Sequence, residues 1–105
     1  MSNVNFEING KKIIAGLPEK LDITISGEVL KTIEEKIKVV NCNELIFDLK
    51  STEFISSAGI GILLNLTRQI KGKNGKTGII NFSEQIKQVF EITDVLGYIN
   101  GDGCI

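Results

Sequence analysis

The first residues of the chain alternate between hydrophobic and polar side chains. Val4, Phe6 and Ile8 recur at a period of two, which is typical of a strand with one buried face. The dipeptide Asn9-Gly10 follows directly and favours a tight hairpin turn. Residues 12–15 then predict a second strand that pairs back on the first and is ended by a Gly-Leu-Pro break.

Residues 21–25 alternate again and contain several β-branched side chains, so we expect a third strand that ends at Ser26-Gly27. From Glu28 onward the period changes to that of a helix. The hydrophobic residues on one face of this helix are Val29, Leu30, Ile33 and Ile37. The spacing predicts a short helix of about three turns that ends before residues 41–43.

Residues 45–49 form the most apolar segment, which predicts a central strand covered on both faces. A long helix is expected next, with a hydrophobic face made by Ile60, Leu63, Leu64, Thr67 and Ile70. Residues 78–82 predict another strand. Ser83 is then expected to cap a further helix, and residues 95–99 to form a short last strand before a loose tail at 101–105.

The expected order of elements is β-β-β-α-β-α-β-α-(β). Strands that alternate with helices after an opening hairpin predict an α/β fold with a mixed sheet. We therefore expect a single domain over residues 1–105, with about three to four helices packed on the sheet, because no linker or internal repeat interrupts the chain.

Composition excludes several classes of function. The chain has 105 residues, 42% of them hydrophobic, and a net charge of -1, so no overall field draws it to nucleic acid or to an anionic membrane. No run approaches the roughly 20 apolar residues that cross a membrane, and the first residues lack the pattern of a secretory signal. We expect a cytoplasmic protein in which Cys42 and Cys104 are reduced thiols.

The sequence contains no histidine, which restricts the chemistry it can perform. Ser-His-Asp triads, Cys-His dyads and most zinc sites all need histidine. A serine nucleophile with a lysine base is the remaining enzymatic alternative, yet residues 54–64, where the candidate serines lie, contain no lysine. We expect no catalytic residue, no metal and no cofactor.

The most distinctive segment is residues 54–64, in which Ser56 and Ser57 precede Ala58, Gly59 and a long apolar helix. The free amides and the dipole at a helix start favour an anion, so a phosphate on one of these serines would be tolerated. It would add about -1.5 to -2 charges to a partner surface that small residues leave open to close approach. The alternative is that either serine is only a helix cap, a role worth about 1 kcal/mol.

Residues 54–64 resemble the signature segment of the STAS family, the sulfate transporter and anti-sigma factor antagonist domain. Residues 21–28, 45–49, 82–83 and 89–93 resemble other blocks of that family, in the same order along the chain. The resemblance implies a STAS-like α/β domain. The chain departs from the family pattern at Ser56, where some members have aspartate, and at Leu30, where many have an acidic residue.

The resemblance also implies a function. Members of the family bind an anti-sigma factor, often a serine protein kinase, and so release a sigma factor. Such a kinase phosphorylates the serine that precedes the small residue and the glycine, here Ser57, and a PP2C-type phosphatase reverses the modification. The positions expected to contact the partner are Ser56, Ala58, Gly59, Ile60 and Glu28, the last of which is expected at an opposite strand end.

A second interpretation keeps the fold without the switch. STAS-like domains also act as constitutive protein-binding subunits, for example on the ATPase of a lipid transporter. In that case Ser57 would only cap the helix, and the partner would lack kinase activity.

Overall fold

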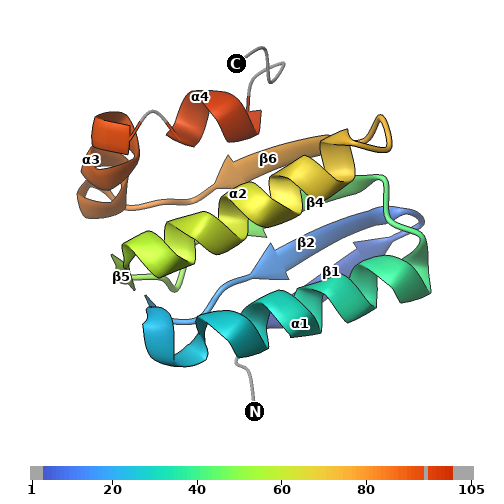
Figure 1. Ribbon diagram of the computed structural model, residues 1–105, viewed down its shortest axis with the longest axis horizontal. Helices are drawn as coiled ribbons and strands as arrows, with labels where there is room; N and C mark the ends of the chain where they lie inside the picture. The colour runs from blue at the N-terminus through green and yellow to red at the C-terminus, as the bar shows by residue number, and fades with distance from the viewer. Residues whose placement is uncertain (1–3, 94, 101–105) are drawn as a thin grey trace.

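The computed structural model describes residues 4–93 and 95–100, and it arranges them in two layers, with helices in front of a twisted sheet (Figure 1). In chain order the elements are β1 (Asn5–Asn9), β2 (Lys12–Gly16), β3 (Lys20–Leu21), α1 (Ile23–Val40), β4 (Glu44–Asp48), β5 (Phe54–Ile55), α2 (Ser57–Lys71), β6 (Lys76–Ile80), α3 (Glu84–Thr93) and α4 (Val95–Asn100). The expected tail at 101–105, with Cys104, lies outside the described residues.

The main sheet has four strands in the order β1-β2-β4-β6. The hairpin of β1 and β2 is antiparallel, and it turns at Gly10, whose φ of 62° suits glycine. The pairs β2–β4 and β4–β6 are parallel, with α1 and α2 in the connections. The expected mixed sheet with an N-terminal hairpin is confirmed, and four helices accompany it.

The core lies between the sheet and the helices α1 and α2. Ile13 and Ala15 of β2 and Leu45 and Phe47 of β4 point into it and are fully buried. Ile46, whose side chain turns to the opposite face of β4, is only half-buried. β4 is therefore central, but the expectation that both its faces are covered is wrong, because α1 and α2 lie on the same side of the sheet (Figure 1).

The third strand and first helix differ from the prediction. β3 ends at Leu21, and α1 is an 18-residue helix that already begins at Ile23. Asp22 caps this helix: its Oδ1 accepts the backbone N–H of Thr24 at 3.0 Å and the Thr24 hydroxyl at 2.6 Å. These bonds, that of the hydroxyl above all, lower the pKa of Asp22. The cap overrides the β-branched alternation of residues 21–25.

The expected last strand is also a helix, α4 (Val95–Asn100). Val95 and Ile99 are four residues apart, so both reach the core from one helical face. The end of α4 is fixed by two side chains: Lys71 Nζ donates to the carbonyl of Tyr98 at 2.7 Å, and Thr77 Oγ1 donates to that of Ile99 at 2.7 Å. Bonds from neighbouring elements thus satisfy the carbonyls at the helix end.

Ser83 caps α3 as predicted, since its Oγ accepts the N–H of Ile86 at 3.2 Å. The expected helix over residues 60–70 corresponds to α2, and the strands at 45–49 and 78–82 correspond to β4 and β6 with shifts of one to two residues. None of the helices within the described ranges is long and apolar enough to cross a membrane.

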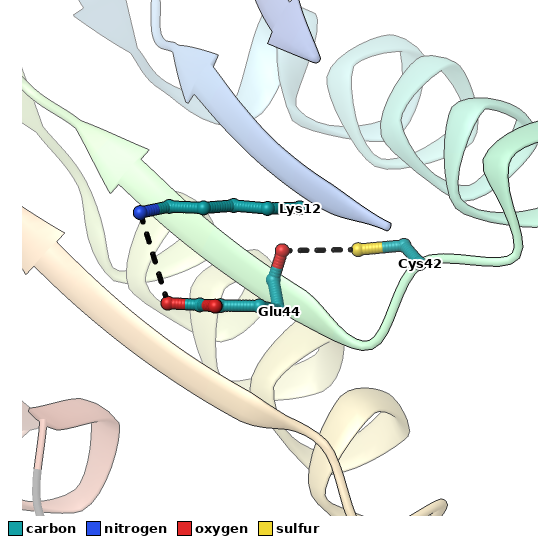
Figure 2. A network of polar contacts seen from close by, with 3 residues as sticks. All are labelled: Lys12, Cys42 and Glu44. Atoms are coloured by element: carbon teal, nitrogen blue, oxygen red, sulfur yellow. Dashed lines mark hydrogen bonds and ion pairs between the residues drawn. The ribbon is translucent and has the colours of Figure 1, made fainter. Parts of the chain in front are cut away.

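Cys42 is buried at the start of the connection into β4, where its Sγ donates to the carbonyl of Glu44 at 3.2 Å (Figure 2). Burial raises the pKa of this thiol, so the neutral form is favoured. Glu44 also faces Lys12 across the β2–β4 ladder, with 3.9 Å between Nζ and Oε2. Cys42 is thus a structural thiol, and the ion pair, which is open to water, contributes little stability.

Candidate functional site

The site is built where the two-stranded ladder of β3 and β5 leads into α2. Leu21 pairs with Ile55 in this ladder. The chain is then held by a backbone bond, in which Ser56 N donates to the carbonyl of Leu21 at 3.0 Å. Below the ladder, the buried Thr52 hydroxyl donates to the carbonyl of Pro18 at 2.9 Å. These bonds fix the position of the first turn of α2 relative to β3 and β5.

Ser56 is the N-cap of α2. Its backbone is extended, with φ -93° and ψ 175°, and its Oγ accepts the N–H of Gly59 at 3.3 Å. The hydroxyl in turn donates to the carbonyl of Leu21 at 3.4 Å, and the carbonyl of Ser56 accepts the N–H of Ile60 at 2.9 Å. The polar groups of Ser56 are thus all used to hold the helix start in place.

Ser57 is the first residue of α2 and is exposed. Within the described ranges, no hydrogen bond engages its hydroxyl. The sequence left open which serine caps the helix, and the structure assigns the cap to Ser56. Ser57 therefore has a free hydroxyl at the surface, one residue into the helix.

Gly59 is buried, and a Cβ at this position would lie 2.5 Å from the carbonyl oxygen of Leu21 and 2.8 Å from Ile55 Cγ1. The glycine is required because α2 crosses β3 and β5 at very short range. The expectation that this small residue leaves room for a partner's backbone is corrected: the chain's own Leu21 occupies that room. Ile60 is 8% exposed and faces the core, while Ala58 is half-buried at the rim.

Glu28 lies in the second turn of α1 and not at a strand end, because that helix starts earlier than predicted. Its side chain is exposed, and its carbonyl accepts the hydroxyl of Thr32 at 2.8 Å. α1 and α2 are neighbours whose N-terminal ends lie at the same end of the molecule (Figure 1). Of the expected site residues, Ser57 and Glu28 are exposed and Ser56 and Ala58 are half-buried, whereas Gly59 and Ile60 are buried.

Two hydrophobic side chains that the sequence analysis did not select are exposed at this end. Ile23, the first residue of α1, is 79% exposed, and Phe54 of β5 is 50% exposed. The alternation of residues 21–25 predicts Ile23 inside a strand, whereas in the structure it is the first residue of a helix. Both residues belong to elements at the end of the molecule where α2 begins (Figure 1), so a partner that binds at this end would cover apolar surface.

The electrostatics of the helix start suit an anion on Ser57. The first turn of α2 contains no acidic residue, and the N–H groups of its first residues have no partner within the helix. The positive end of the helix dipole therefore faces the Ser57 hydroxyl. A phosphate ester there would be compatible with the fold while adding about -1.5 to -2 charges to this surface. Among the described residues, no group of three His, Cys, Asp or Glu side chains could hold a metal ion.

Comparison with known proteins gives a family match over almost the whole chain. The family model described as "STAS domain" matches residues 3–102. An anti-sigma F factor antagonist from Paenibacillus polymyxa is 24% identical over 81 residues, which cover 77% of this chain and 69% of that protein.

Solved structures show the same fold. A putative anti-sigma factor antagonist from Thermotoga maritima superimposes with a TM-score of 0.84 at 19% identity, over 92% of this chain and 83% of that one. The anti-sigma factor antagonist SpoIIAA in its unphosphorylated form gives a TM-score of 0.78 at 20% identity, over 88% and 81%. SpoIIAA of Bacillus in its phosphorylated form gives 0.71 at 20% identity, over 88% and 84%.

Proposed function

Because this chain belongs to the STAS domain family, we propose that it is an anti-sigma factor antagonist that is switched off by phosphorylation of Ser57. The observation that carries the proposal is that the two serines at the start of α2 have different roles. Ser56 makes the cap bonds, and Ser57 keeps a free, exposed hydroxyl next to it. The similarity to anti-sigma factor antagonists in sequence and fold supports the same proposal.

The partner is an anti-sigma factor that is also a serine protein kinase. When this chain binds the anti-sigma factor, the anti-sigma factor releases the sigma factor that it held. The kinase supplies ATP and Mg²⁺, and this chain supplies only the acceptor hydroxyl and the surface around it. A PP2C-type phosphatase restores the active form. No step in this cycle needs a catalytic group from the chain.

The switch works through charge at an apolar contact. Ile23 and Phe54 are exposed at the same end of the molecule as Ser57, so a bound partner removes them from water. A phosphate on Ser57 would bring about two negative charges into this contact and would have to be desolvated there. The fold itself is spared, because the helix dipole favours the added charge.

The alternative, a constitutive STAS-type binding subunit, requires that Ser57 has only a structural role. The cap bonds of Ser56 leave no such role at position 57 among the described contacts. This is the reason to prefer the switch.

A titration of the candidate anti-sigma factor kinase from the same organism tests the proposal. We expect Ser57→Ala to bind like the wild type, within about twofold, and Ser57→Asp to bind at least about 100-fold more weakly, which corresponds to about 2.7 kcal/mol. Equal affinity of the two variants would leave the constitutive subunit as the better account.

A further inference from the structure

The strand β1 forms one border of the main sheet, and its free backbone groups can be identified. Leu17 N donates to a carbonyl of β4 at 3.0 Å, so the odd-numbered residues of β2 bond to β4. Even-numbered Ile14 then bonds to β1, where it pairs with Glu7. Phe6 and Ile8 therefore direct their N–H and C=O groups away from the sheet.

This border carries few of the features that usually prevent two sheets from joining, and its one charged residue is Glu7. Its five residues, Asn-Phe-Glu-Ile-Asn, include no lysine and no proline, and they pair with β2 without a bulge. Ile8 is 44% exposed. The other outer strand, β6, begins with Lys76 and packs against α4. Of the two borders, β1 is the one prepared to accept another strand.

An open groove runs between β1 and α1, lined by Phe6, Thr32, Glu35, Lys36 and Val39. Val39 is 81% exposed, the highest value among the large hydrophobic residues that the structure describes. Lys36 Nζ lies 5.2 Å from the centre of the Phe6 ring. The lysine charge is therefore held over this ring at the edge of the groove. The groove therefore offers apolar surface beside the free backbone groups, with one acid and one base at its edge.

We propose that a second copy of this chain occupies the β1 border, with the two β1 strands antiparallel about a two-fold axis at Phe6. This register places Phe6 against its own copy and Val4 against Ile8 on the helix-covered face. On the other face it places Asn5 against Glu7, an amide against a carboxylate. A register centred on Glu7 would instead oppose two carboxylates, which is unfavourable.

The position of the α1 helices also favours a second copy of the chain at the β1 border. α1 returns from β2 to the parallel strand β4, so it runs opposite to β2 and along β1 (Figure 1). Two-fold symmetry then sets the two α1 helices antiparallel, with Val39 of each facing the other copy. Glu35 of one copy comes to the side of Lys36 of the other, and the groove is thus complementary in charge to itself.

This dimer does not rest on the proposed function. None of its contact residues belongs to the surface around Ser57, and antiparallel pairing sends the two Ser57 residues to opposite ends of the assembly. Each copy would keep its own partner surface.

Sedimentation velocity over a concentration series tests the dimer. We expect the wild type to form a dimer, and Ile8→Lys to raise the dimer dissociation constant at least about tenfold while the circular dichroism spectrum is unchanged. Ile80→Lys is the matched control, because Ile80 is an isoleucine of similar exposure, 40%, on the opposite border strand. It should dimerise like the wild type.

The register has its own test in a Cys104→Ser background. The double variant Asn5→Cys/Glu7→Cys should form a disulfide between copies on mild oxidation, whereas Glu7→Cys alone should not. A wild type that stays monomeric up to about 1 mM, or a dimer that Ile8→Lys leaves intact, overturns the proposal; 1 mM corresponds to only about -4 kcal/mol of binding free energy. Efficient cross-linking of Glu7→Cys alone overturns the register.

Discussion

The hydroxyl oxygen of Ser56 accepts the backbone N–H of Gly59 at 3.3 Å, and this one bond separates the roles of two adjacent serines. Ser56 is committed to the helix start, whereas Ser57, the first residue of α2, is exposed. The stability of the fold and the control of binding can therefore be changed independently at neighbouring positions.

The cap predicts unequal effects of alanine at the two serines. Ser56→Ala removes the acceptor for the Gly59 amide and should lower the free energy of unfolding by about 1 kcal/mol. Ser57→Ala removes an exposed hydroxyl and should change it by less than about 0.5 kcal/mol. Urea denaturation of both variants measures the difference. Equal losses would show that Ser57 shares the cap.

Two glycines of α2 should respond to alanine with opposite signs. Gly59→Ala would place a Cβ 2.5 Å from the carbonyl oxygen of Leu21, and we expect a loss of about 1–3 kcal/mol. Gly61 is exposed, with nothing within 4 Å of the added Cβ, so Gly61→Ala should gain about 0.5–1 kcal/mol by favouring the helix. Thermal unfolding of the pair checks this, and a stabilising Gly59→Ala would contradict the close contact with Leu21.

Asp22 predicts a pH dependence of stability. The hydrogen bond from the Thr24 hydroxyl is the main cause that lowers the pKa of Asp22 below the ordinary value of an aspartate. A carboxyl whose pKa is lower in the folded state stabilises the fold above the unfolded pKa and loses this contribution as the pH falls through the folded one. The stability advantage of the wild type over Asp22→Asn should therefore shrink between about pH 5 and pH 2. An advantage that grows on acidification would contradict the cap.

The exposed apolar side chains predict a loss of binding without a loss of stability. Ile23 is 79% exposed, so Ile23→Ser should change the free energy of unfolding by less than about 0.5 kcal/mol. If the partner covers it, the affinity should fall about tenfold or more, which a titration calorimeter resolves. Val39→Ser, at the opposite end of α1 and with a similar exposure of 81%, is the control and should bind normally. An unchanged affinity of Ile23→Ser would place the partner contact elsewhere.

The parts of the fold that sequence predicted are those with long, regular periodicity. The alternation of Val4, Phe6 and Ile8 and the Asn9-Gly10 turn were sufficient for the hairpin, because both its strands and its turn are local. The apolar face of α2 was equally clear. Periodicity of this kind reflects the side of an element that packs on the protein, although in β1 Phe6 is only half-buried and Ile8 is 44% exposed.

The parts that it missed depend on competition between local preferences or on distant contacts. At residues 21–25 the alternation suggested a strand, but the side chain of Asp22 binds Thr24 and starts a helix there. The reason for Gly59 lies in Leu21, which is far from it in sequence. Which serine caps α2 likewise depends on the position of β3, through the bond of Ser56 to Leu21.

The most direct test of the switch is the intact mass of the protein purified from its native cells under several growth conditions, with fragment mapping of any modified form. We predict a fraction that carries one phosphate, located on Ser57 and not on Ser56. A protein that is unmodified under every condition, or a phosphate that maps to another residue, would contradict the account.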